Sequence, residues 1–155
     1  MISPELLRRF PFFAGFDDNQ LKSLAMIAEE NNVLAHATIF EEGKKAENFF
    51  ILISGSVDLS IKSEEVNTPG SMREFAVGEI NPGEVFGINA LLEPYKHGFT
   101  ERAAQDCKLI EFDGLALRTL MEEDKDLAYQ LMLQISRTLI DRLYSTRIQL
   151  AAAWA

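Results

Sequence analysis

The residues best suited to chemistry lie in one segment, GEVFGINALLEPYKHGFTERAAQD, at positions 83–106. Two closely spaced glycines, Gly83 and Gly87, allow the backbone to turn tightly and to approach a ligand. A short helix opening near residues 88–90 would direct its first N–H groups toward an anion. Arg102 would add a positive charge that can form two parallel hydrogen bonds. The segment is therefore a candidate anion-binding loop.

Each of these residues also has an ordinary structural interpretation. Arg102 can form an ion pair with an acidic neighbour such as Glu84 or Glu93. Glycines commonly serve only as turn residues, and Asn89 can cap a helix or face solvent. From the residues alone, both interpretations stay open.

Other chemistries find little support in the sequence. His36 and His97 have no acidic or cysteine partner at ligand spacing, which argues against a metal site. Cys107 is the single cysteine, so no disulfide forms within the chain. No GxSxG segment or comparable nucleophile setting is present. We therefore expect a protein that is not an enzyme and that holds no metal and no cofactor.

Composition places the chain among ordinary folded domains. It has 155 residues, of which 47% are hydrophobic and 25% charged, which fits a single domain. The formal net charge is −9, whereas binding to a phosphate backbone needs clustered Lys and Arg, so no direct nucleic-acid contact is expected. No apolar run approaches the roughly 20 residues that span a bilayer, and the first residues lack a signal peptide's apolar core. We expect a cytoplasmic protein without a membrane contact.

A helical start is predicted at about residues 1–31. Asp17 and Gln20 have the spacing of a capping box, and Phe16 and Leu21 that of a hydrophobic staple. These pairs predict a helix from about 18 to 30.

A β region follows at about residues 32–113. ATIFEEG predicts a strand that ends in a turn at Gly43, and FFILISG predicts a continuous apolar strand up to Gly55. Val57, Leu59 and Ile61 then alternate with polar residues, as in a strand with one buried face.

The rest of the β region is divided by turn signals. SEEVNTPGSM contains Pro69-Gly70 and predicts a hairpin loop before a strand at 74–77, with further turns at Gly78 and at 81–83. RAAQDCKLIEFD predicts two more strands that break near Asp106. Regular strands and turns of this kind predict an antiparallel β roll, or jelly roll.

The last part, about residues 114–152, predicts a short helix and then a long one. It contains neither Gly nor Pro after Gly114 and is rich in strong helix formers. An apolar ridge repeats every four residues along the long helix, at Leu127, Leu131, Ile135, Leu139 and Leu143. The apolar stripe is broader than one face, so we expect it to pack on the roll and also to form a homodimer.

These segments, in this order, resemble the cyclic nucleotide-binding domain family, of the catabolite activator protein and protein kinase A regulatory subunit type. The resemblance covers nearly the whole chain. It rests on PFFAGFDDNQLKSLA for the opening helix, ATIFEEGKKAENFFILISGSVDLSI for the first strands, GEVFGINALL and RAA for the two ends of the phosphate-binding cassette, and LIDRL in the closing helix.

The resemblance implies a ligand site between the cassette and the long helix. In the family, backbone N–H groups and one arginine hold the cyclic phosphate, a glutamate accepts the ribose hydroxyl, and the closing helix covers the base. Carried onto this chain, the ligand-binding residues are Phe86, Gly87, Ile88, Asn89, Ala90, Leu91, Arg102, Ala103, Ala104, Arg142 and Tyr144.

Two departures from the family pattern concern the ligand. Ile88 stands where the family has its ribose-binding glutamate, and the lost charged hydrogen bond is worth roughly 1.5 to 3 kcal/mol. Arg102 follows Ile88 by fourteen residues, a longer interval than in typical cassettes. The segment EPYKHGFTE therefore carries an insertion.

The sequence thus predicts a regulatory, non-catalytic domain. It would bind a cyclic nucleotide, cAMP or cGMP, or a related small anion, and would signal through the C-terminal helix. The alternative is a protein interaction or dimerisation module of the same fold whose nucleotide pocket is no longer used. Ile88 and the insertion favour that alternative, whereas Arg102-Ala103-Ala104 favours the ligand sensor.

Overall fold

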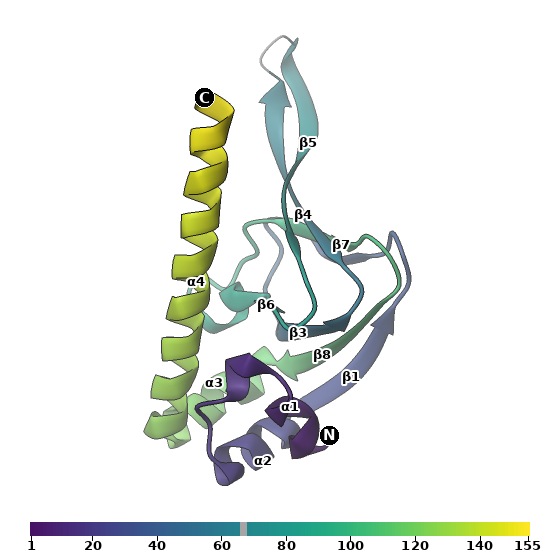
Figure 1. Cartoon of the computed structure of the whole chain (residues 1–155). Coiled ribbons are helices and arrows are strands. Elements are labelled where there is room, and N and C mark those ends of the chain that lie inside the picture. The colour runs from purple at the N-terminus through teal and green to yellow at the C-terminus, as the bar shows by residue number, and fades with distance from the viewer. Residues whose placement is uncertain (66–67) are drawn as a thin grey trace.

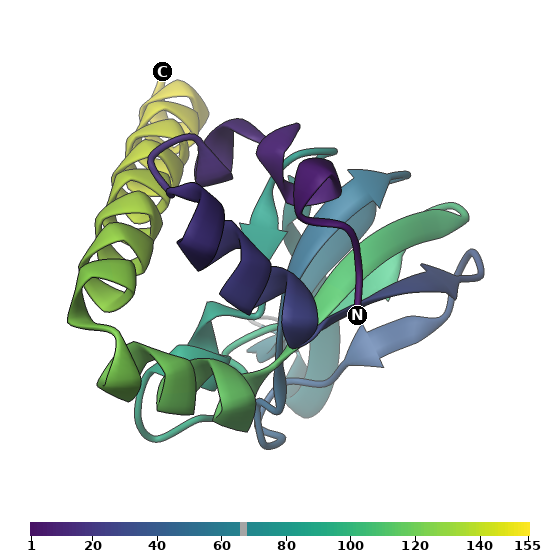
Figure 2. The ribbon, with the colours of Figure 1, turned by 90° about the horizontal axis from the view of Figure 1, so that it is seen from below.

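The computed structural model describes residues 1–65 and 68–155. A β roll stands on a layer of short helices, and one long helix runs beside both (Figure 1). Figure 2, seen from below, shows that the N-terminal helices and α3 cover the base of the roll. The architecture confirms the predicted jelly roll with flanking helices.

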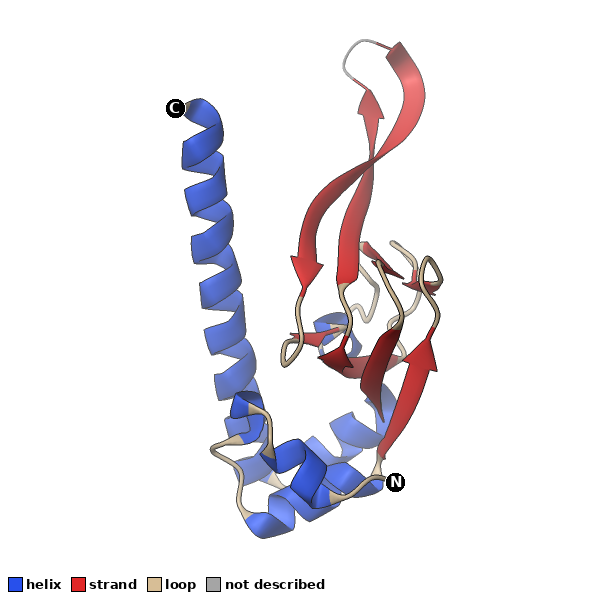
Figure 3. Ribbon diagram, turned by 45° about the vertical axis from the view of Figure 1, so that its right-hand side comes forward, coloured by secondary structure: helices blue, strands red, loops and turns tan. Residues whose placement is uncertain are grey.

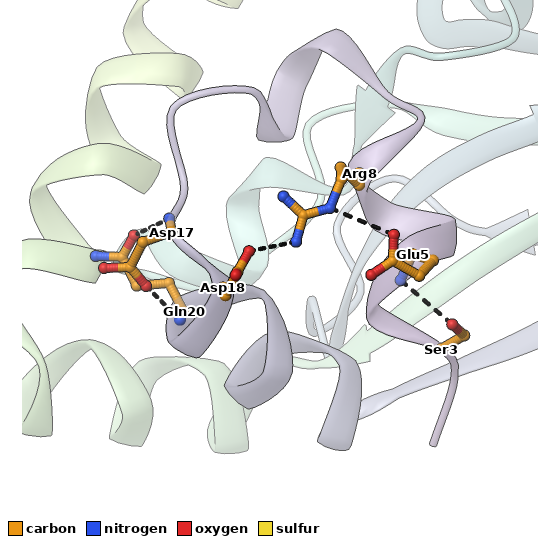
Figure 4. Close-up of polar contacts among 6 residues, drawn as sticks. All are labelled: Ser3, Glu5, Arg8, Asp17, Asp18 and Gln20. Atoms are coloured by element: carbon orange, nitrogen blue, oxygen red, sulfur yellow. Dashed lines mark hydrogen bonds and ion pairs between the residues drawn. The ribbon is translucent and has the colours of Figure 1, made fainter.

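The N-terminal layer consists of three short helices. They are α1 (Pro4–Arg8), η1 (Pro11–Phe13) and α2 (Asp18–Met26). The predicted capping box is present, because Asp17 accepts a hydrogen bond from the Gln20 amide and the Gln20 side chain accepts one from the Asp17 amide (Figure 4). Arg8 pairs with both Glu5 and Asp18, which ties α1 to the start of α2.

The predicted end of α2 was wrong. The helix ends at Met26, and β1 (Ala28–Val33) already belongs to the roll. Residues 28–33 pair antiparallel with residues 107–112 along their whole length. This long-range ladder overrides the local preference of AEENNV for helix. The roll therefore starts four residues earlier than expected.

Within the described residues, eight strands form two four-stranded antiparallel sheets. The first sheet has the order β1-β8-β3-β6 and the second β2-β7-β4-β5. Besides β1, the strands are β2 (Thr38–Phe40), β3 (Asn48–Ser54), β4 (Val57–Glu65), β5 (Thr68–Ile80), β6 (Val85–Phe86), β7 (Thr100–Ala103) and β8 (Cys107–Asp113).

The central residues of β3, 49–52, are all apolar because both faces of the strand are buried there. Phe49 and Ile51 pack in the cluster that joins the first sheet to the helices. Phe50 and Leu52 point the other way, into the interior of the roll. Neighbouring side chains along a strand point to opposite faces, so residues 49–52 contribute alternately to the helix-facing core and to the interior of the roll.

The β4–β5 hairpin is longer than predicted. Most of SEEVNTPGSM is strand, with Glu64 paired to Met72, and the predicted turn at Pro69-Gly70 lies within β5. The predicted turn at Gly78 was also wrong, since Gly78 pairs with Leu59. Residues 66 and 67, part of the predicted loop, lie outside the described residues. Figure 3 shows the hairpin extending past the roll on the side where α4 ends.

The chain closes with α3 (Gly114–Glu123) and α4 (Lys125–Trp154), as predicted. Asp113 and Asp124 cap them by accepting hydrogen bonds from the amides of Ala116 and Leu127. The apolar ridge of α4 divides in two. Its first part, Leu127, Leu131 and Ile135, is buried in the helix-facing core, whereas Leu139 and Leu143 are about half exposed.

Candidate functional site

The candidate cassette begins where β6 ends. Gly87 has a φ of 71°, and a Cβ at this position would lie 2.7 Å from the Asn48 carbonyl oxygen and 2.8 Å from the Phe50 ring. Only glycine fits both this conformation and this close approach. The predicted short helix follows as η2 (Ile88–Leu91), a single 3₁₀ turn.

The residues of η2 are held mainly by packing. Ala90 and Leu91 are buried, and Ile88 packs against the helix-facing core. The Asn89 side-chain amide donates to the Lys96 carbonyl over 2.7 Å, so it neither caps a helix nor stays free. Arg118 of α3 donates to the Ala90 carbonyl over 2.5 Å.

The segment between η2 and β7 is anchored to the β2–β3 loop. The Ala46 amide donates to the Tyr95 carbonyl, and His97 exchanges backbone hydrogen bonds with Gly43 and Lys44 at 2.8 and 2.9 Å. The Arg118 guanidinium lies 4.2 Å from the centre of the Tyr95 ring. This segment is therefore held against the β2–β3 loop and α3.

The structure corrects the placement of Arg102. Arg102 of β7 pairs with Thr38 of β2 on one side and with Asp58 of β4 on the other. Both partners are exposed. Directly paired residues share a face of a sheet, so Arg102 lies on the solvent face. Its guanidinium binds Glu74, which also accepts a hydrogen bond from Ser60. Hydrogen bonds from Ser60 and Arg102 lower the pKa of Glu74.

This pairing agrees with the structural interpretation of Arg102, an ion pair with an acidic residue, but with a different partner. The ion pair is made with Glu74, not with Glu84 or Glu93, and the guanidinium does not join η2. Ala103, one residue on, points inward and packs with Phe86 in the core of the roll. The Ala104 amide donates to the Ser56 carbonyl over 2.8 Å.

A different arginine reaches into the roll. Arg142 of α4 is largely buried, and its Nη2 donates to the Val85 carbonyl, one residue before Phe86. Burial lowers the pKa of Arg142, whereas the nearby carboxylates of Glu84 and Glu101 raise it. Tyr144, the other residue nominated on this helix, is 67% exposed and faces away.

Glu101 faces Arg142 from the inner side of β7. The residue is only 5% exposed, and its Oε2 atom has no hydrogen-bond partner among residues 1–65 and 68–155. Burial raises the pKa of Glu101 to about 8, and the Arg142 charge opposes part of that rise. A carboxyl group in this environment is mostly protonated at pH 7.

Parallel aromatic rings lie beside Glu101. Phe40 of β2 lies directly opposite Glu101 in the antiparallel pairing of β2 with β7. The Phe40 ring stacks on the His97 ring, with centres 3.6 Å apart, and on Phe50, which in turn stacks on Phe86 at 4.9 Å. Burial lowers the pKa of His97, which favours the neutral ring. Phe50, Phe86 and His97 are at most 6% exposed, so these rings lie in the interior of the roll beside the carboxyl group of Glu101.

Sequence reasoning missed Glu101, Phe40 and His97. One signal was available for Glu101, because in a strand its side chain must point opposite to that of Arg102. The register of the neighbouring strands decides which of the two points inward. Nothing in the local sequence marked Phe40 or His97, since their stacking joins segments more than fifty residues apart.

The comparison with known proteins settles the family. Residues 30–124 match the family model for the cyclic nucleotide-binding domain. The chain belongs to this family.

Individual family members are similar over most of the chain. A candidate cyclic nucleotide-binding protein of known structure from Geobacter metallireducens GS-15 is 33% identical, with a TM-score of 0.79 covering 92% of this chain and 99% of that one. The cAMP-activated global transcriptional regulator Vfr of Pseudomonas aeruginosa is 30% identical over 118 residues, 72% of this chain and 50% of Vfr.

The curated relatives are regulatory proteins. Besides Vfr, they include the cAMP-dependent protein kinase regulatory subunit of Mycosarcoma maydis, 24% identical over 116 residues, 72% of this chain and 22% of that subunit. The chain thus spans about half the length of Vfr and less of the kinase subunit. In the part of the chain that the structure describes, no helix is long and apolar enough to cross a membrane.

Proposed function

We propose that this chain is a regulatory domain that binds a cyclic nucleotide inside the roll, between η2, β7 and α4. Membership of the family carries this proposal. The chain has the family's roll, the glycine-led η2 turn and a long C-terminal helix beside them. The ligand is either cAMP or cGMP.

In this site Arg142 takes the role that the resemblance assigned to Arg102. Arg142 is the arginine that reaches the residues just before η2, whereas Arg102 is engaged by Glu74 on the solvent face. A guanidinium in a poorly hydrated site is a strong partner for a phosphate oxygen. It also belongs to α4, so its contact with a ligand would couple binding to the position of that helix.

Signalling would follow from this coupling. A ligand shifts a conformational equilibrium only as far as it binds one state more tightly than the other. A nucleotide that engages both the roll and Arg142 favours the arrangement in which α4 lies against the roll. An effector attached to α4 or bound to it would read that position.

The test is isothermal titration calorimetry with cAMP and cGMP, using 5′-AMP as a non-cyclic control. One of the cyclic nucleotides is expected to bind. At a free concentration of 100 times its Kd, the bound nucleotide should raise the free energy of unfolding by roughly 2.7 kcal/mol. Arg142→Ala should weaken binding by about tenfold or more, the loss of a charge-assisted hydrogen bond. Arg102→Ala, the matched control, should bind like the wild type. Absence of binding at millimolar nucleotide would contradict the proposal.

The second candidate is an interaction module with a disused pocket. Three observations favour it: Ile88 packs into the core where the family places a glutamate, Arg102 is paired elsewhere, and Arg142 already binds a backbone carbonyl. On this view Arg142 holds α4 against the roll without a ligand. The calorimetry above separates the two functions.

We also propose that α4 mediates a homodimer. Apolar side chains recur along the exposed side of its second half at Leu139, Ile140, Leu143, Tyr144 and Ile148. Ile140 and Tyr144 lie on the helix face opposite Leu131, Ile135 and Arg142, which face the chain's own core. Leu139, Leu143 and Ile148 lie on the two flanks between these faces. An exposed apolar stripe of this length is typical of a protein interface.

If this stripe of α4 forms the dimer interface, a charged side chain placed in it should separate the two subunits. Leu143→Asp should convert the protein to a monomer, because the carboxylate would be buried without a partner in the interface. Analytical ultracentrifugation measures the change in mass. Gln149→Asp, on the same helix but off the apolar stripe, should leave the dimer intact. A wild-type protein that sediments as a monomer at micromolar concentration would rule out this interface.

A further inference from the structure

The buried carboxyl group of Glu101 is not explained by the fold. Glu101 points to the inner side of the roll, like Ala103 two residues later, and lies between Phe40 of β2 and Leu59 of β4. A hydrophobic residue would fill this position without cost. A strand that buries a glutamate among apolar neighbours loses stability unless the group has a partner.

For one of the two carboxyl oxygens, the part of the chain that the structure describes supplies no hydrogen-bond partner. Glu101 is 5% exposed, and among the described residues its Oε2 is a buried side-chain atom without a hydrogen bond. Buried polar atoms nearly always have a partner, and an exception calls for an explanation such as a ligand. Arg142 is near enough to act on Glu101 electrostatically, but its Nη2 donates to the Val85 carbonyl.

The surroundings of Glu101 indicate which kind of ligand would supply the missing donor. Phe40, next to Glu101, belongs to a set of parallel rings with His97, Phe50 and Phe86. An apolar lining of aromatic side chains suits a flat heterocycle. A carboxyl oxygen beside them accepts a hydrogen bond from an N–H at the edge of that heterocycle.

We propose that Glu101 recognises the exocyclic amino group of a purine base and thereby sets which cyclic nucleotides the roll accepts. This inference rests on the proposed function and deepens it. Adenine and guanine both carry such an amino group, whereas unsubstituted purine has no N–H on its six-membered ring. Glu101 is thus a specificity residue that accepts a hydrogen bond through Oε2.

The experiment compares three nucleotides on the full chain by calorimetry: cAMP, cGMP and purine riboside 3′,5′-cyclic monophosphate. Wild-type protein should bind cAMP or cGMP about tenfold or more tightly than the unsubstituted purine nucleotide. Glu101→Met, which keeps the length of the side chain and removes both oxygens, should abolish that preference. Glu101→Gln keeps one acceptor oxygen and should retain most of it.

Controls separate recognition from packing. Glu74→Gln alters a carboxylate on the outer face of the same sheet and should leave all three affinities unchanged. Glu101→Leu repeats the comparison with a different side-chain shape, and circular dichroism confirms that each variant is folded. The wild-type comparison needs no variant at all.

The outcomes are distinct. If wild-type protein binds cAMP or cGMP but binds the unsubstituted purine nucleotide equally well, the inference about Glu101 is wrong and the proposed function stands. The same holds if Glu101→Met weakens all three nucleotides alike. If none of the three binds, the proposed function fails and the inference fails with it.

Discussion

Replacing Glu101 with glutamine is expected to raise the free energy of unfolding at pH 8 by up to about 5 kcal/mol, with little gain at pH 4. The pKa of Glu101 is about 8 in the folded protein, against an ordinary value of 4.5 for a glutamate in water. Between these values the native state keeps a proton that the unfolded state has released. Stability therefore falls as pH rises through this range, and a glutamine, which does not titrate, removes that fall.

The measurement is urea unfolding of wild type and Glu101→Gln at several pH values between 4 and 8.5. The difference between the two proteins isolates Glu101 from the other titrating carboxylates. It should grow steadily from pH 4.5 to 8 and then level off. Parallel curves over the whole range would show that the carboxyl group is hydrated or paired in solution.

Phe86→Ala is expected to destabilise the fold by about 3–5 kcal/mol, the usual cost of removing a buried aromatic side chain. Phe86 is 1% exposed, stacks on Phe50 and packs with Ala103 inside the roll. It also immediately precedes Gly87, so the cavity would lie directly beneath η2. Nucleotide binding should weaken together with stability.

Urea denaturation at constant pH measures this effect, with an unchanged m value showing that the unfolded state is the same. Phe86→Leu is the matched control. It retains most of the apolar volume and should cost clearly less than the alanine variant. A loss below about 1 kcal/mol for Phe86→Ala would mean that the roll is loosely packed at this point.

The comparison of Arg102 with Glu101 shows what limits sequence-based assignment of this site. Both residues lie in the short strand TERA, and alternation requires that one point inward and the other outward. The strand itself does not determine which. That choice follows from pairing with β2 and β4, whose residues Thr38 and Asp58 keep Arg102 on the exposed face.

The glycine-led turn was easier to predict. Gly87 and the short helix after it are local features, and the structure has both where they were expected. The partners of that turn were not predictable locally. Asn48 and Phe50 of β3 lie close to Gly87. Arg142, more than fifty residues later in the sequence, donates to the Val85 carbonyl from α4.

The sequence by itself determined the elements whose signals are local: the Asp17–Gln20 cap, the alternating strand from Val57, the continuous apolar strand around Phe50, and a short helix followed by a long one. Only the tertiary structure decided where α2 gives way to β1, how far the hairpin extends, and which arginine enters the roll. The reason is that strand register is set by distant partners, and a shift of one residue exchanges the inner and outer faces of a strand.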